Sequence, residues 1–338
     1  MIAVKKIPNL LAYFVFFGVF LLLPLPTQAS ERLNVYTIWS ERYATAVFEE
    51  FTRETGIGVD FLRFSSGEVL ARLTAEKNNP QVDVFFGGIA DAFVAGKKEG
   101  IFEPYVPKGA DAIPLRFRDP EGYWTGVAIN PICFMFNREF LEKRALDAPV
   151  SWQDLLDPAY KNALIMADAR TSGTAVSRLF SLVIAMGEDE AFTYQKKLDA
   201  NMQQYTKSGA GGALPIGRGQ AAGGVFFLVD ALEMLQTGYD IVISYPEEGV
   251  VYGVEAMGMI QGAKRPELAK KFLDWAAGPR MQQIYEREKI NLIPTHPEVE
   301  LRNPALDMTG VKLLELDIEW SGDQRGRLVE RWVNEIIR

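Results

Sequence analysis

The chain has 338 residues, is 48% hydrophobic and carries a formal net charge of −8 at pH 7, with a single histidine and a single cysteine. This length suggests about two domains, and the acidity argues against nucleic acid as a partner. Cys133 lies in an apolar run and has no second cysteine to pair with, so we expect a buried, inert thiol. Without a Cys/His cluster we also expect no zinc site.

The N-terminus has the features of a secretory signal peptide. Lys5 and Lys6 precede an apolar run, 10–23, that is too short to span a bilayer comfortably. The segment 27–29 offers small residues where a signal peptidase reads, so we expect cleavage after Ala29 and export to the periplasm. Cleavage would remove two lysines and leave 309 residues with a net charge of −10. An uncleaved N-terminal anchor is the alternative interpretation.

After this segment the chain alternates between strand and helix patterns. Strands are expected at 33–38, 57–64 and 82–86, each followed by a helix. Such βαβ units predict a parallel sheet covered on both faces. Ligands of parallel sheets bind beyond the carboxyl ends of the strands. This rule places 39–41, 65–66 and 87–88 along one edge of a first lobe.

The next stretch, 123–137, is β-rich but too long for one ordinary strand. We interpret it as the crossing into a second lobe, with a return crossing at 252–260. The second lobe then holds a short helix at 151–156, a strand at 163–166, helices at 174–186 and 188–201, and a strand at 225–229. Helices at 266–277, 279–289 and 326–337 follow the return. We therefore assign 30–128 with 256–338 to lobe 1 and 129–255 to lobe 2, with a hinge that can close a cleft.

The segment Thr171-Ser172-Gly173-Thr174 stands at the start of an apolar helix. Free backbone N–H groups, the positive end of the helix dipole and three hydroxyls suit a phosphate, sulfate or carboxylate. An ordinary N-cap is the alternative, but it needs only one of these hydroxyls. We favour an anion site.

Residues of the first lobe could face this site. Ser65 and Ser66 begin a helix, and the spacing of Ser65 and Glu68 is that of a capping box, so ligand binding and capping remain equally good explanations. Ser40 can be both N-cap and ligand donor, whereas Glu41 can simply complement the helix dipole. Gly88 follows the third strand at the same edge.

Two acidic positions are candidates for the other end of a ligand. Asp230 follows the apolar strand 225–229 and precedes a helix, where it can cap the helix or accept hydrogen bonds from a polyol. Glu247 and Glu248 are adjacent and repel each other, so one of them facing a cleft requires a partner. A solvated loop pair is the alternative.

Other motifs do not support an enzyme. Gly217–Gly223 superficially resembles a dinucleotide fingerprint, but its third glycine is one residue late and it precedes a strand. A Ser/His/Asp triad would have to use His296, and no Gly-x-Ser-x-Gly elbow is present.

Several segments together resemble the iron(III) and organophosphate branch of the periplasmic solute-binding proteins of ABC importers. They are 33–36, 83–86, 151–161, 171–174 and 262–272. The most specific is Trp152-x-Asp-Leu-Leu-Asp-Pro-x-Tyr160-Lys161. The resemblance covers most of the chain after residue 29. It implies an α/β fold of the type II periplasmic binding protein class, with two lobes that each hold a central β-sheet flanked by helices and are joined by a hinge.

The resemblance also bears on the ligand. Ferric members hold Fe³⁺ with paired tyrosines near the strand 225–229, where this chain has Phe226 and Phe227 and no Tyr-Tyr pair. Sugar-phosphate and phosphonate-binding members use hydroxyl-rich helix N-termini and carboxylates. The segment 246–252 resembles their Pro-x-Glu-Gly-x-x-Tyr motif, apart from Val250-Val251, and this implicates Glu248 with Asp230.

We therefore predict a monomeric, non-catalytic protein without cofactor or metal. It would capture a small phosphorylated or phosphonate solute and pass it to an ABC permease and its ATPase. The predicted ligand-binding residues are Ser40, Glu41, Ser65, Ser66, Gly88, Thr171, Ser172, Gly173, Thr174, Asp230 and Glu248. A ferric-binding protein and a secreted hydrolase or transferase are the alternatives.

Overall fold

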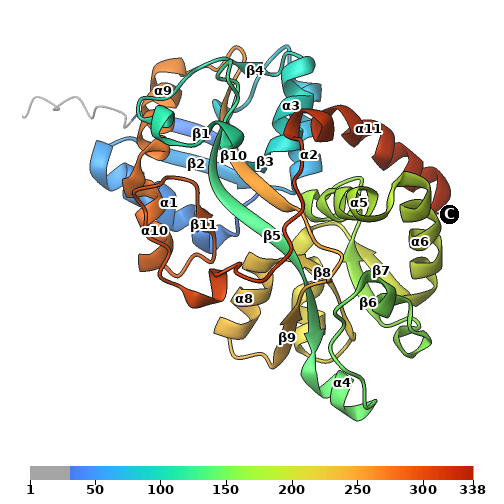
Figure 1. Cartoon of the computed structure of the whole chain (residues 1–338). Coiled ribbons are helices and arrows are strands. Elements are labelled where there is room, and N and C mark those ends of the chain that lie inside the picture. The colour runs from blue at the N-terminus through green and yellow to red at the C-terminus, as the bar shows by residue number, and fades with distance from the viewer. Residues whose placement is uncertain (1–30, 338) are drawn as a thin grey trace, which may run out of the picture. The chain divides into compact units, whose positions relative to one another are not determined.

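The computed structural model describes residues 31–337 (Figure 1). The predicted signal peptide, 1–29, lies outside the described residues. Within the described part, no helix combines the length and apolarity needed to cross a membrane. Helices flank an extended β-structure in which eight strands follow the order β2-β1-β3-β10-β5-β8-β6-β7, and β4, β9 and β11 pair alongside.

One strand, β5 (Thr125–Asn137), belongs to two sheets. Its first half pairs antiparallel with β10 (Tyr252–Ile260), and its second half pairs antiparallel with β8 (Gly223–Phe227) and β9 (Ile241–Ser244). None of its thirteen residues is charged, and all but Ile129 are buried. The interpretation of 123–137 as a connection between two sheets is thus matched by its pairing.

The first sheet contains the parallel strands expected from the N-terminal βαβ pattern. Its strands are β1 (Arg32–Thr37), β2 (Gly58–Arg63), β3 (Val84–Ile89), β4 (Phe102–Glu103), β10, β11 (Ile293–Pro294) and the first half of β5. Its helices are α1 (Glu41–Thr55), α2 (Ser66–Glu76), α3 (Ala90–Lys98), α9 (Pro266–Ala277) and α10 (Pro279–Arg287). Phe48, Phe51, Phe86 and Phe272 pack edge to face or tilted in the core between them.

The second sheet is built around the other half of β5. It adds β6 (Leu164–Ala167), β7 (Met202–Thr206), β8 and β9, with α4 (Arg138–Lys143), α5 (Gly173–Met186), α6 (Glu188–Leu198), α7 (Ala213–Gly217) and α8 (Leu228–Gln236). The predicted short helix at 151–156 is a 3-10 helix, Trp152–Leu156. Trp152 is fully buried and packs against Phe134 of β5.

The chain after β11 returns to the second sheet before it ends. Leu306 lies in the core cluster of Cys133 and Met135, and Val250 forms a β-bridge with Leu313. The boundaries of the two lobes remain a prediction, but this packing departs from the assignment of all of 256–338 to lobe 1. These contacts join residues that are far apart in the sequence, so a local sequence pattern does not reveal them.

The terminal helix α11 (Ile318–Glu335) begins eight residues before the predicted start at residue 326. The Asp317 side chain caps it by accepting a hydrogen bond from the Trp320 amide, 3.1 Å. Gly322 does not break the helix, because it lies where it packs against Val94 of α3, and a side chain there would collide. Tertiary packing therefore outweighs the low helix propensity of glycine.

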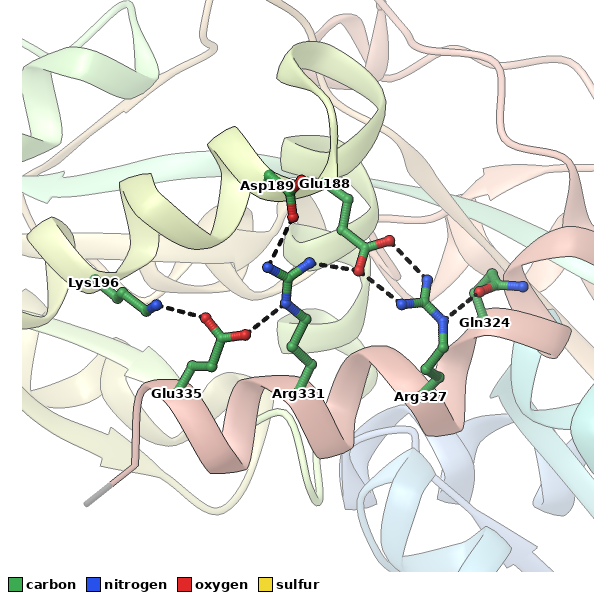
Figure 2. A network of polar contacts seen from close by, with 7 residues as sticks. All are labelled: Glu188, Asp189, Lys196, Gln324, Arg327, Arg331 and Glu335. Atoms are coloured by element: carbon green, nitrogen blue, oxygen red, sulfur yellow. Dashed lines mark hydrogen bonds and ion pairs between the residues drawn. The ribbon is translucent and has the colours of Figure 1, made fainter.

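Helix α11 contacts elements on both sheets. Arg325 forms a buried ion pair with Asp91 of α3. Farther along α11, Arg327 and Arg331 share the Glu188 carboxylate of α6, and Lys196 pairs with Glu335 (Figure 2). These guanidinium groups hold the pKa of Glu188 at about 2, well below its ordinary value.

Trp332 anchors α11 in the core beneath α5 and α6, with no exposed surface and its ring 5.2 Å from that of Tyr205. Replacing it with alanine leaves a cavity, so we expect Trp332→Ala to lower the free energy of unfolding by about 3–5 kcal/mol. The exposed Glu330→Ala on the same helix should change it by less than about 0.5 kcal/mol. Chemical denaturation of both variants measures the difference, and equal stabilities would contradict this role of Trp332.

Candidate functional site

A cavity lies between the two sheets, beside β5. Its wall comes from the ends of β1 and β2 and the starts of α1 and α2 on one side, and from the starts of α5 and α8 on the other. The lining residues are Ile38, Trp39, Ser40, Tyr43, Arg63, Ser65, Ser66, Asn130, Ser172, Gly173, Thr174, Gly209, Ala210, Phe227, Val229, Asp230, Glu233, Glu255 and Leu292. This is the strand-end location expected from the sequence.

The N-terminus of α5 supplies one wall of the cavity. Strand β6 ends at Ala167, and the next residue, Asp168, holds the turn by accepting a hydrogen bond from the Arg170 amide, 2.8 Å. The helix then starts so that Ser172 and Thr174 line the cavity, both buried. Gly209 lies against the Thr174 hydroxyl, where a side chain would collide with it.

The N-terminus of α2 supplies the opposite wall. Ser65 caps α2 in the predicted capping box with Glu68. Ser66 is 1% exposed, and its hydroxyl has no hydrogen-bond partner among residues 31–337. A buried hydroxyl without a partner is unfavourable unless a ligand or water satisfies it. Two helix N-termini that carry hydroxyl groups therefore face the same cavity.

Thr171, which was predicted to belong to the anion site, is not among the residues that line the cavity. Its hydroxyl donates a hydrogen bond to the Lys207 carbonyl oxygen, 2.6 Å. Its own carbonyl oxygen accepts a hydrogen bond from the Gly67 amide of α2, 2.9 Å. Thr171 thus joins the two walls through its backbone.

Carboxylates gather at the other end of the cavity. Asp230 lies in the first turn of α8, half-buried, and Glu233 follows one turn later. Glu255 of β10 is 2% exposed and accepts hydrogen bonds from Asn130 Nδ2, 2.7 Å, and from the Trp39 indole. Nearby in the lining, the hydroxyls of Ser40 and Tyr43 are buried without partners within the described part of the chain.

These carboxyl groups have raised pKa values. Burial raises the pKa of Asp230 to about 7, with a further contribution from Glu233, and Arg63 opposes the shift. Burial also raises the pKa of Glu255 to about 7, where the hydrogen bonds from Asn130 and Trp39 oppose it and Asp230 adds to it. Each of these carboxyl groups is therefore ionised more readily when a hydrogen-bond donor or a cation lies beside it than when it is alone.

Three other predicted residues lie outside the cavity. The Glu248 carboxylate accepts hydrogen bonds from the Ser151 hydroxyl, 2.5 Å, and the Trp152 amide, 3.1 Å, so it caps the 3-10 helix and is absent from the lining of the cavity. Its neighbour Glu247 is exposed and is also absent from the lining. Glu41 is exposed at the start of α1, and Gly88 is buried within β3, where a side chain would collide with Phe85.

Several lining residues were missed by sequence reasoning. Glu255 had a usable signal, because it is the one carboxylate in the otherwise apolar stretch 252–260. Arg63, Tyr43 and Asn130 gave no comparable local signal. They reach the cavity because β2, α1 and β5 converge there.

Comparisons with known proteins define the class. Residues 79–315 match the model of the bacterial extracellular solute-binding protein family, and the chain belongs to this family. A probable ABC transporter periplasmic-binding protein of Sinorhizobium fredii is 25% identical over 91% of this chain and 86% of its own. A putative 2-aminoethylphosphonate-binding periplasmic protein of Salmonella paratyphi A is 26% identical over 78% of this chain and 79% of its own.

A solved structure supports the same class. The periplasmic binding protein AfuA from Actinobacillus pleuropneumoniae, with exogenous fructose-6-phosphate bound, has a TM-score of 0.87 and 33% identity, covering 90% of this chain and 98% of its own. The predicted two-lobed, type II fold and the predicted function of solute capture for an ABC transporter are confirmed at this level. The relatives are periplasmic binding proteins, in agreement with a periplasmic location.

The raised pKa of Asp230 predicts a pH-dependent stability. In the folded chain this carboxyl keeps its proton up to about pH 7, whereas in the unfolded chain it loses it near its ordinary value of 3.8. The ligand-free protein should therefore lose stability, on the order of 1 kcal/mol, as the pH rises from 5 to 8. Asp230→Asn should reduce this slope without abolishing it, because the pKa of Glu255 is also raised to about 7, and the exposed Asp111→Asn should retain the full slope. Thermal melts across that pH range test this, and parallel slopes in all three proteins would contradict it.

Proposed function

We propose that the cargo of this solute-binding protein is a small organophosphate or phosphonate. The observation that carries the proposal is the convergence of two helix N-termini, those of α2 and α5, on one buried cavity. Each brings the positive end of a helix dipole and hydroxyl donors, and the start of α5 adds backbone N–H groups. Ser66, Ser172 and Thr174 would hold the anionic oxygens, with Ser65 and Gly173 beside them.

The rest of the cargo would lie toward the acidic end of the cavity. Asp230 would accept hydrogen bonds from hydroxyl or ammonium groups, and Ser40 would add a donor. Both sugar phosphates and aminoalkylphosphonates combine these two ends. The relative named for 2-aminoethylphosphonate and the neighbour with bound fructose-6-phosphate support this class of cargo.

Contacts across the rim support a closed, ligand-retaining arrangement. Besides the Gly67–Thr171 hydrogen bond, Lys207 pairs with Glu68, and Arg42 approaches Glu233 to 3.8 Å. Exposed ion pairs of this kind contribute little individually, so bound cargo would have to supply most of the free energy of closure. The closed form would then be recognised by an ABC permease and its ATPase, and no chemical turnover would take place.

We expect the hydroxyl of Thr174 to be needed for affinity and that of Thr171 to be dispensable. Thr174→Val removes a hydrogen bond to a charged group, which is worth about 1.5–3 kcal/mol and hence about 10- to 100-fold in Kd. Thr171→Val makes the same substitution at a position outside the cavity, and it should alter Kd by less than about threefold. Calorimetric titration with a hexose 6-phosphate and with 2-aminoethylphosphonate provides the measurement.

The controls for this titration separate the proposed cargo from the ferric alternative. When a true cargo is present at 100 times its Kd, the wild-type protein should gain about 2.7 kcal/mol of stability. Fe³⁺ should give neither this gain nor a visible charge-transfer colour. If no organophosphate or phosphonate binds, or if both threonine variants weaken binding equally, the proposed site is wrong.

We also propose that export removes residues 1–29. The basic start, short apolar run and small residues before Ser30 support cleavage there. Intact mass spectrometry of protein recovered from the periplasm should give a chain that begins at Ser30. A mass that retains the first 29 residues would favour the uncleaved anchor instead.

A further inference from the structure

Arg178 of α5 is a buried cation without an anionic partner. It is 2% exposed, yet it forms no ion pair within residues 31–337, and its Nε has no hydrogen-bond partner there. Burying an unpaired charge is strongly unfavourable, because the interior cannot replace the hydration of the guanidinium. Arginine does not escape this penalty by losing its proton, even though burial lowers its pKa. A charge in this position therefore needs an explanation.

A second buried arginine in the same protein shows the usual solution. Arg325 of α11 is 5% exposed and is neutralised by the carboxylate of Asp91, itself buried on α3. Arg178 has no equivalent of Asp91. The two residues therefore form a natural comparison between a paired and an unpaired buried guanidinium.

The groups near Arg178 are already engaged elsewhere. Asp168, Tyr194 and Tyr205 are the groups close enough to act on its charge. The Asp168 carboxylate is held by Arg170, 2.5 Å, and the Tyr194 hydroxyl donates to the Trp152 carbonyl oxygen, 2.7 Å. The Tyr205 hydroxyl donates to Asp199, 2.9 Å. None of them forms an ion pair or a hydrogen bond with the guanidinium within residues 31–337.

The position of Arg178 on α5 relates its charge to the cavity. It follows Thr174 by four residues, and residues at this spacing share one face of a helix. Long helical side chains lean toward the helix N-terminus, which here is the end that lines the cavity with Ser172, Gly173 and Thr174. Arg178 is not itself a lining residue, so it would act on a ligand through the electric field.

We propose that the counter-charge of Arg178 is the anionic group of the cargo. This inference rests on the proposed function and adds a positioning residue that makes the site selective for doubly charged phosphates and phosphonates. Without cargo the protein keeps an uncompensated buried charge behind the N-terminus of α5. Binding of a dianion neutralises it, and a neutral or singly charged analogue does so less well.

The test is the variant Arg178→Met, which keeps an apolar side chain of similar length and removes the charge. We expect its ligand-free melting temperature to equal or exceed that of the wild type, because an unpaired buried charge has been replaced by a hydrophobic group. We expect its Kd for a hexose 6-phosphate and for 2-aminoethylphosphonate to rise about tenfold or more, as for two charges about 10 Å apart in a protein. Arg178→Gln, which keeps a polar side chain but removes the charge, should lose as much affinity.

Arg325→Met is the matched control. It leaves Asp91 buried without a partner, so its ligand-free melting temperature should fall while the Kd of the folded protein stays unchanged. If the ligand-free melting temperature is maintained or rises in Arg178→Met but falls in Arg325→Met, and only Arg178→Met loses affinity, then Arg178 serves binding at the expense of stability. If Arg178→Met folds poorly, the Arg178→Gln protein still tests the charge, because wild-type affinity there would overturn the inference.

The outcomes separate this inference from the proposed function. Wild-type binding together with unchanged affinity in Arg178→Met would overturn the role of Arg178 alone. A melting temperature that falls as in Arg325→Met, with no change in Kd, would make Arg178 a structural residue. Failure of wild-type protein to bind either probe would overturn the proposed function, and the inference with it.

Discussion

Everything at the site depends on β5, a single strand that is hydrogen-bonded into two sheets at once. Because the backbone of one strand runs through both sheets, the loops that follow β1 and β2 on one side and β6 and β8 on the other meet beside it. Helices α2 and α5 then begin at these loops and direct their N-termini into the same space. The proposed binding of an anion rests on this convergence, since neither helix alone would enclose a ligand.

The cavity joins two kinds of polar group that would be unfavourable in isolation. The Ser40 and Ser66 hydroxyls at the helix starts have no hydrogen-bond partner within residues 31–337. Burial raises the pKa values of the Asp230 and Glu255 carboxyl groups, and Asp230 adds to the shift at Glu255. Such incomplete pairing is expected where a protein keeps free energy of interaction for a ligand. A molecule with an anionic end and a hydrogen-donating end satisfies both groups, which unites the proposed cargo with the chemistry of the walls.

Stability is supplied away from this site. Aromatic packing around Phe272 and the fully buried Trp152 and Trp332 hold the helices on the sheets. Helix α11 contacts α3 through a buried ion pair and α6 through a surface network (Figure 2). These contacts stabilise the folded chain, so its net free energy of unfolding can remain favourable despite the unpaired polar groups at the cavity and at Arg178.

The sequence by itself determined the family, the alternating strands and helices up to residue 98, the shared strand, and the two segments, 65–66 and 172–174, that form the helix starts of the cavity. These are local properties of periodicity and capping. Only the tertiary structure decided that Thr171 and Glu248 bond to the backbone elsewhere, and that Glu255, Arg63 and Tyr43 line the cavity. The physical reason is that the partner of a side chain depends on which elements, distant in the sequence, pack beside it. The residues next to it in the sequence do not reveal those contacts.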